Sequence, residues 1–218
     1  MKGNIQVGVV GLGKFGLKFG QTLVELGRQV VGVDTDPEKI RQAQQVFTQV
    51  LQADATDKEA LRQIGFGDLS HVLVSVGDSI AASTMISMFL KELRVPEVWV
   101  KAINKDHEKL LRKIGVDEVF IPEHLAANQL ANRIAIPGFI EYLPFESGMV
   151  LKQLVVNEWS GKVLRDLDLT NRFSAQIVAI KKKGEAHFRF IPKGSDMLQQ
   201  GDTLVVLGTN DLLARIVP

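Results

Sequence analysis

Three glycines near the start of the chain have the spacing of a phosphate-binding turn. Gly11, Gly13 and Gly16 form a G-x-G-x-x-G motif directly after the apolar stretch 5–10. Gly11 permits a tight turn, Gly13 lets backbone N–H groups approach a phosphate, and Gly16 lets a following helix pack against the strand. The N-terminus of that helix also favours an anion. The motif therefore predicts a nucleotide phosphate site.

Polar residues follow the later apolar stretches where a nucleotide needs hydrogen-bond partners. Asp34 ends the stretch 29–34, so its carboxylate is placed to accept from ribose hydroxyls. Asp54 follows the third predicted strand, where it either accepts from an adenine amino group or caps the next helix. Ser75 and Gly77 lie at the carboxyl end of the fourth predicted strand. Because ligands of open parallel sheets bind at the carboxyl ends of strands, these residues are candidates for the same site.

The elements that position these residues alternate between strand and helix. The predicted strands are 5–10, 29–34, 48–52, 71–76, 97–103 and 118–121, and the predicted helices are 17–27, 37–47, 57–64, 79–93 and 106–114. Such alternation implies parallel βαβ units and an α/β fold with a Rossmann-like, doubly wound parallel sheet. A nearly continuous apolar strand, such as 72–76, is what a sheet covered on both faces requires.

The pattern changes after the sixth predicted strand. Residues 125–140 read as a helix that the alternation does not need; Pro137 and Gly138 should end or kink it, and Pro144 should close the junction. The remainder predicts a smaller α+β lobe with strands 150–156, 175–181, 186–191 and 203–208, a short helix 162–167 and a terminal helix from residue 210. We therefore expect a nucleotide-binding domain over 1–124, a linking helix and hinge over 125–144, and a dimerising lobe over 145–218.

Composition excludes several classes of function. The chain contains no cysteine, which rules out disulfides, thiolate metal sites and thiol nucleophiles. Lys and Arg total 26 against 25 Asp and Glu, and a formal charge of +1 gives no overall attraction to nucleic acid or to an anionic membrane. No uncharged apolar stretch approaches the roughly 20 residues that span a bilayer. These features predict a soluble, cytoplasmic protein.

A reaction centre is not evident beside the nucleotide motif. A dehydrogenase of this architecture needs a general acid or base next to the nicotinamide, and the second lobe offers only His187. The histidines at 71, 107 and 124 lack metal-ligand spacing and are expected in surface or loop positions. The prediction is therefore a sensor and not an enzyme. An NAD(P)-dependent oxidoreductase and a purely structural dimerisation module are the alternatives.

Taken together, these segments resemble the RCK domains (regulators of potassium conductance), and most closely the cytoplasmic Ktr/Trk-type subunits of bacterial potassium uptake systems. The likeness covers the whole chain in order. It rests on Gly11-Leu12-Gly13-Lys14-Phe15-Gly16, Asp34, Ala53-Asp54-Ala55-Thr56, Trp99-Val100-Lys101-Ala102, Ile121-Pro122-Glu123 and Gln200-Gly201-Asp202-Thr203-Leu204-Val205-Val206-Leu207-Gly208. It implies an RCK_N lobe, a crossover helix and an RCK_C lobe over the three predicted ranges.

The resemblance implies that the RCK_N lobe binds ATP or ADP, with NAD or NADH as the alternative. Carried onto this chain, phosphate contacts fall on Gly13, Lys14, Phe15 and Gly16, ribose contacts on Asp34 and Asp36, and adenine contacts on Asp54 and Ala55, with Lys101 near the phosphates. Glu123 matches an acidic position that helps hold a divalent or sodium cation. Ktr-type subunits usually carry arginine where this chain has Lys14, and lysine loses the bidentate fork.

The resemblance also implies partners. Homodimers would assemble into a ring, expected to be an octamer, beneath a potassium-translocating membrane subunit, so that the protein is peripheral on the inner face of the membrane. A potassium channel or an efflux system stays open as the partner. Related C-terminal lobes bind cyclic di-AMP at their dimer seam. The comparable places here are Arg172, Ala175, Ile177 and Pro192, which otherwise read as a surface arginine, core apolar residues and a turn proline.

Overall fold

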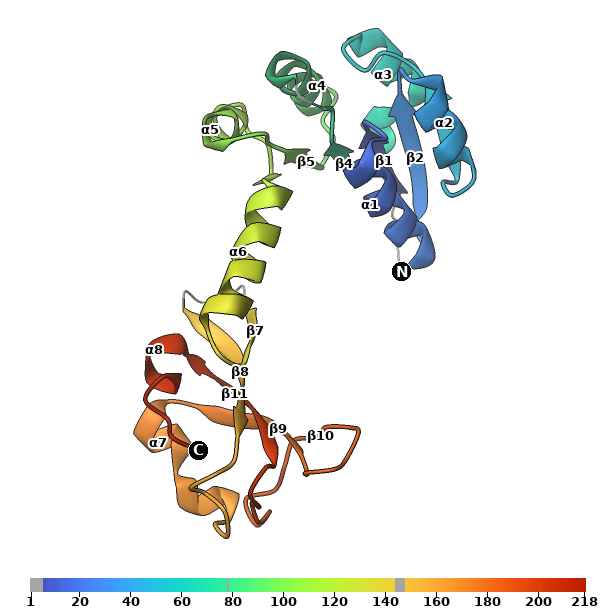
Figure 1. The fold of residues 1–218 in the computed structure, drawn as a ribbon. Helices are drawn as coiled ribbons and strands as arrows, with labels where there is room; N and C mark the ends of the chain where they lie inside the picture. The colour runs from blue at the N-terminus through green and yellow to red at the C-terminus, as the bar shows by residue number, and fades with distance from the viewer. Residues whose placement is uncertain (1–5, 78, 144–147) are drawn as a thin grey trace. The chain divides into compact units, whose positions relative to one another are not determined.

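The chain divides into two units, Met1–Glu123 and His124–Pro218, each with its own sheet and core (Figure 1). The structure is a computed structural model and describes residues 6–77, 79–143 and 148–218. Pro144, expected to close the junction, lies outside the described residues. Within the described parts of the chain, no helix is long and apolar enough to cross a membrane.

The first unit is built on a six-stranded parallel sheet in the order β3-β2-β1-β4-β5-β6. Its strands are β1 (Gln6–Val10), β2 (Gln29–Asp34), β3 (Gln49–Gln52), β4 (His71–Val74), β5 (Glu97–Lys101) and β6 (Glu118–Phe120). The chain runs outward from β1 to β3 and then returns to start β4 on the other side of β1. This arrangement confirms the predicted Rossmann-like sheet, and its strand order reverses between β1 and β4.

Helices cover both faces of this sheet (Figure 1). They are α1 (Lys14–Glu25), α2 (Pro37–Gln44), α3 (Lys58–Ile64), a 3₁₀ turn (Phe66–Asp68), α4 (Ile80–Glu92) and α5 (Lys105–Lys113). Successive side chains of β1 point to opposite faces, so Val9 joins the core beneath α1 and α2, and Val10 joins the core beneath α3, α4 and α5. Burial on both faces explains why these strands are almost continuously apolar.

The second unit has a five-stranded antiparallel sheet in the order β10-β9-β11-β8-β7. Its elements are β7 (Phe139–Tyr142), β8 (Met149–Val155), a 3₁₀ turn (Leu164–Leu167), α7 (Leu169–Phe173), β9 (Gln176–Lys181), β10 (Arg189–Phe190), β11 (Thr203–Thr209) and α8 (Asn210–Leu213). Leu204 and Val206 of β11 are fully buried in its core. The smaller lobe is therefore α+β, as predicted.

Several predicted elements differ in extent from those of the structure. The first helix begins at Lys14 and not at residue 17, because Gly13 adopts the extended N-cap conformation directly in the glycine turn. The helix expected over 125–140 is α6 (Pro122–Ala135), and β7 follows it. Gly138 turns the chain at φ 76° and a Cβ there would lie 2.1 Å from the Gln153 carbonyl oxygen, so the chain can approach β8 and pair with it.

In the second lobe, the predicted helix 162–167 is a 3₁₀ turn over Leu164–Leu167, and the short helix α7 after it was missed. The predicted strand 186–191 is reduced to the two residues of β10, which pair antiparallel with β9. Propensity alone therefore overestimated the regular structure at the edge of this sheet.

Candidate functional site

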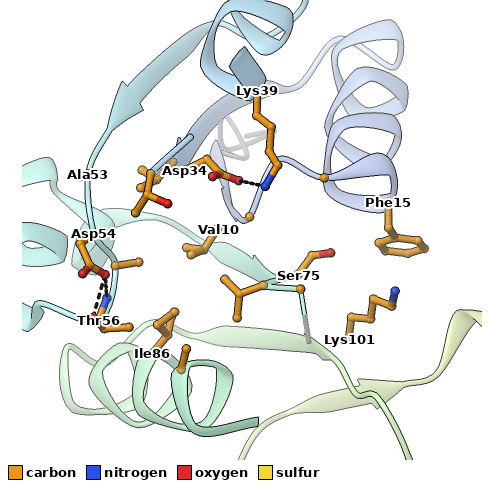
Figure 2. A pocket seen from close by; sticks show the side chains of 18 of the residues that line it. Val10, Phe15, Asp34, Lys39, Ala53, Asp54, Thr56, Ser75, Ile86 and Lys101 are labelled. Atoms are coloured by element: carbon orange, nitrogen blue, oxygen red, sulfur yellow. Dashed lines mark hydrogen bonds and ion pairs between the residues drawn. The ribbon is translucent and has the colours of Figure 1, made fainter. Parts of the chain in front are cut away.

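A cavity of about 500 Å³ lies at the carboxyl ends of the parallel strands, where the strand order reverses. Its walls come from the glycine turn after β1 and from the residues that follow β2, β3, β4 and β5 (Figure 2). Val10, Val33 and Ile86 give it an apolar floor. A volume of this size, with an apolar floor and a few convergent polar groups, is typical of cofactor pockets.

The three glycines of the turn are surrounded differently. Gly11 has φ 90°, and a Cβ on it would lie 2.3 Å from the Ser75 carbonyl oxygen. A Cβ on Gly16 would lie 2.0 Å from the Gly11 carbonyl oxygen. Gly13 lines the cavity with φ −66°, and a Cβ on it would meet no protein atom within 4 Å. The protein thus leaves space at Gly13 beside the N-terminus of α1, which suits a phosphate group.

Asp34 at the end of β2 braces this turn. One carboxylate oxygen accepts from the Leu12 backbone N–H at 2.7 Å, and the other accepts from the Asp36 N–H at 2.9 Å. Only 8% of its side chain is exposed, and the Lys39 ammonium lies 3.6 Å away. Each carboxylate oxygen can accept more than one hydrogen bond, so a ribose hydroxyl can still bind here.

Asp54 lines the cavity just after the end of β3, the strand next to β2. It accepts from the backbone N–H of Thr56 at 2.9 Å and from the Thr56 hydroxyl at 2.7 Å, and these bonds lower the pKa of the Asp54 carboxyl. The N-cap of α3 is Asp57, whose side chain accepts from the Glu59 N–H. The capping alternative for Asp54 is therefore wrong, and its carboxylate stays ionised beside the cavity.

Two of the lysines on the cavity wall were expected there from the sequence. Lys14 is the exposed first residue of α1, and Lys101 ends β5. Lys101 forms an ion pair with Glu123 at 2.8 Å. The Phe15 ring stands at the cavity edge and packs against Phe120, with ring centroids 5.4 Å apart. A bound phosphate would thus meet positive charge from the start of α1 and from the end of β5.

Nine of the twelve residues expected to bind the nucleotide line this cavity. They are Gly11, Gly13, Lys14, Phe15, Asp34, Asp54, Ala55, Gly77 and Lys101. The other three lie next to it in supporting roles: Gly16 lets α1 approach the turn, Asp36 caps α2 by accepting from the Glu38 N–H, and Glu123 pairs with Lys101. Sequence reasoning missed Lys39, which also lines the cavity.

The histidines do not contribute to the cavity wall that the described residues form. His107 was expected at a surface or loop position, which is wrong: it is 1% exposed in the first turn of α5. Its Nδ1 accepts from the Ile103 N–H at 3.3 Å, and burial lowers the pKa of the imidazole. Among the described residues, no three His, Asp or Glu side chains cluster as a metal site.

A second cavity of about 200 Å³ lies in the smaller lobe. Ala175, Ile177 and Pro192 line it, as do polar groups of Arg165 and Asp168. Arg172 does not line it; its guanidinium lies over the Phe173 ring, 5.2 Å from the centroid. Of the four residues expected at a second ligand site, Ala175, Ile177 and Pro192 thus line the same cavity of a single lobe.

The family of the protein follows from its two lobes. The TrkA-N domain matches residues 7–122, and the TrkA-C domain matches residues 154–217. The chain therefore belongs to the RCK-domain family of Ktr- and Trk-type proteins.

Two potassium uptake proteins are similar to this chain over nearly its whole length. The Ktr system potassium uptake protein C of Bacillus subtilis (strain 168) is 34% identical, over 95% of this chain and 93% of the relative. The Ktr system potassium uptake protein A of Vibrio alginolyticus is 32% identical, over 98% of this chain and 96% of the relative.

Solved structures share the fold at lower identity. The GsuK channel bound to NAD is 20% identical with a TM-score of 0.56, over 97% of this chain and 38% of that one. GsuK has also been solved bound to ADP, with a TM-score of 0.51 and 20% identity over 59% of this chain and 33% of that one. At this identity the likeness shows the fold alone.

Proposed function

We propose that this protein is the nucleotide-sensing regulatory subunit of a potassium transport system and that it gates a separate membrane protein. The observation that carries the proposal is the cavity at the strand switch point, where Gly13 leaves open space beside Lys14. The relatives named as potassium uptake proteins match nearly the full length of this chain, which supports the transport role.

The cavity suggests how an adenine nucleotide binds. The phosphates lie at the N-terminus of α1 between Lys14 and Lys101, the ribose lies on Asp34, and the adenine lies towards Asp54 and Ala55. ATP and ADP are the proposed ligands, with NAD or NADH as the alternative; each contains an adenosine diphosphate portion that fits this arrangement. A cation held by Glu123 near the phosphates is part of the same proposal.

The exposed apolar side chains of α6 support assembly. This helix has no buried residue in the single chain, and Leu125, Leu130 and Ile134 are 64%, 59% and 88% exposed. Leu130 and Ile134 are one turn apart and share a face, and apolar surface of this kind left in water is normally covered by a partner. In the proposed assembly α6 crosses to a second copy, the second lobes pair, and dimers form a ring, an octamer, beneath the membrane subunit.

The second cavity is the proposed site for cyclic di-AMP. Its support is the convergence of Ala175, Ile177 and Pro192 with the cationic Arg165. Calorimetry with cyclic di-AMP on the full chain tests this part separately, and an absence of heat would retire it without affecting the nucleotide site.

The proposal is tested by identifying the nucleotide that the purified protein retains, by mass spectrometry, and by adding nucleotides during thermal unfolding. A ligand that binds only the folded state adds about 2.7 kcal/mol at a hundredfold excess over its Kd. Stabilisation by ATP or ADP is the expected result. No shift with any adenine nucleotide would contradict the proposal, and a nicotinamide absorbance change on turnover would favour the oxidoreductase.

A further inference from the structure

Lys39 occupies a position that does not help its own helix. It is the third residue of α2, which begins at Pro37 after the N-cap Asp36. The N-terminus of a helix carries partial positive charge, so an acidic residue in the first turn is favourable and a lysine is not. Glu38 follows this rule and Lys39 breaks it. A residue that conflicts with local preference is expected to serve something outside its element.

The side chain of Lys39 is partly exposed to solvent and also lines the cavity. Figure 2 shows its side chain reaching from α2 towards Asp34 at the cavity wall. Its ammonium lies 3.6 Å from the Asp34 carboxylate and 3.9 Å from that of Asp36. Both separations exceed hydrogen-bond length, so attraction holds Lys39 near Asp34 while its three N–H donors remain available to a ligand.

Together, Asp34 and Lys39 match the chemistry of a hydroxyl group. A hydroxyl donates one hydrogen bond and accepts others. Asp34 is held rigidly by the N–H groups of Leu12 and Asp36 and has lone pairs left to accept from that hydroxyl. Lys39 supplies the matching donor from the same wall of the cavity.

We infer that Lys39 is a specificity-determining residue of the proposed nucleotide site, and that with Asp34 it selects ribose over deoxyribose. The inference rests on the proposed function. A ligand that lacks the hydroxyl cannot donate to the Asp34 carboxylate or accept from the Lys39 ammonium. Sites built to bind a hydroxyl discriminate strongly against analogues that lack it. Asp34 accepts from the hydroxyl, and Lys39 adds a donor to the oxygen of the same hydroxyl, so the pair discriminates more strongly than the carboxylate alone.

Calorimetry of the full-length protein with ADP, 2′-deoxy-ADP and 3′-deoxy-ADP tests the inference. ADP is the probe because ATP and NAD both contain its adenosine diphosphate portion. The parent should prefer ADP to at least one deoxy analogue by about tenfold or more, as expected for a hydrogen bond to a charged group. Lys39→Met should weaken ADP about tenfold and leave that analogue nearly unchanged, so that the preference collapses.

Two further variants separate recognition from folding. Lys39→Arg keeps the charge and the donors and should retain the preference for ADP. Lys105→Met is the matched control, because Lys105 also opens a helix of the first unit, is exposed, and does not line the cavity. Ligand-free Lys39→Met should unfold cooperatively near the parent midpoint, because removing a positive charge from the first turn of α2 offsets the lost attraction to Asp34.

The results distinguish failure of the Lys39 inference from failure of the proposed nucleotide binding. Binding of ADP by the parent with the same preference in Lys39→Met, or loss of preference in Lys39→Arg or Lys105→Met, overturns this inference alone. A parent that binds no adenine nucleotide overturns both.

Discussion

Gly11 and Gly16 are required by the backbone around them, whereas Gly13 faces open space. At Gly11 the positive φ and the nearby Ser75 carbonyl oxygen each exclude a side chain, and at Gly16 the Gly11 carbonyl oxygen does so. At Gly13 neither restraint applies, since φ is −66°. In this motif, Gly11 and Gly16 are therefore required by the fold, and Gly13 is required by the proposed ligand.

This difference predicts opposite behaviour of two variants. Gly13→Val should fold with a loss of about 1 kcal/mol, because the extended backbone there tolerates valine and only the glycine N-cap is lost. It should nevertheless lose thermal stabilisation by ATP, since the side chain fills the space for phosphate. Gly11→Ala should instead cost about 1–3 kcal/mol or more in the absence of nucleotide. A Gly13→Val protein that responds to ATP like the parent would show that the phosphate site is misplaced.

His107 predicts a pH dependence of stability. Burial lowers its pKa in the folded state from the ordinary value of 6.5, so the unfolded chain binds the proton more readily. Its contribution is therefore fully present above about pH 6.5 and is lost as the pH falls towards the folded pKa. Thermal unfolding between pH 7.5 and 5.5 should show a smaller decline in His107→Gln than in the parent. The exposed His124→Gln is the control, and equal slopes in His107→Gln and the parent would contradict the assignment.

At the residue scale, the sequence predicted groups whose role is local. The glycine turn is readable because a short spacing defines it, and Asp34 is readable because it ends the next predicted strand. Lys39 and His107 were missed or wrong for the same reason: the chemistry of each depends on neighbours brought by folding, such as Asp34 of β2 for Lys39 and the packing around the start of α5 for His107. A lysine in the first turn of a helix is a weak sequence signal that could have directed attention to Lys39.

At the scale of elements, α6 is the helix whose composition the single chain does not explain. Its apolar residues are exposed, so replacing them should leave the fold of one chain intact. We expect Leu130→Glu combined with Ile134→Glu to reduce the molar mass measured by light scattering while circular dichroism stays unchanged.

Leu26→Glu provides the comparison for α6, because Leu26 is 69% exposed at the end of α1. That variant should keep the parent's mass. If the parent itself is a monomer at micromolar concentration, or if Leu26→Glu dissociates it equally, α6 has no special part in assembly.

The alternation of strands and helices made the first sheet predictable, because apolar residues recur with a different period in strands than in helices. The errors fall where tertiary pairing decides. Residues 139 and 140 were expected at the end of the helix 125–140, and they instead begin β7 because β8 offers a hydrogen-bonding edge that sequence periodicity does not reveal. The short edge strand β10 was overestimated for a related reason, since little packs on it and both of its residues are exposed.

At the scale of the whole molecule, the proposed gating requires ATP and ADP to differ in how strongly they favour one shape of the ring. This difference in binding free energy must be large enough to shift the population from one shape to the other. Shifting two ring shapes from 1:99 to 99:1 requires about 5.5 kcal/mol of differential binding. A single site usually supplies about 1–3 kcal/mol of coupling. Lys14 is exposed, so one contact with a terminal phosphate falls short of this requirement. Identical sites in a ring that switches as a unit can supply the sum.

Lys14 is the residue whose charge should report the terminal phosphate. Lys14→Ala should leave the Kd for ADP within about fivefold, because its exposed position implies a contribution of no more than about 1 kcal/mol to the shared phosphates. The ratio of ATP to ADP affinity should fall, as measured by competition calorimetry. A larger loss for ADP than for ATP would show that Lys14 contacts the inner phosphates instead.

The most direct test of the account is potassium flux through the protein reconstituted with its membrane partner in vesicles. The account predicts higher flux with ATP than with ADP, and the same high flux with a non-hydrolysable ATP analogue, because binding alone shifts the ring. Lys14→Ala should narrow the difference. Equal flux with ATP and ADP in the unmutated complex would contradict the gating mechanism, even if both nucleotides bind the cavity.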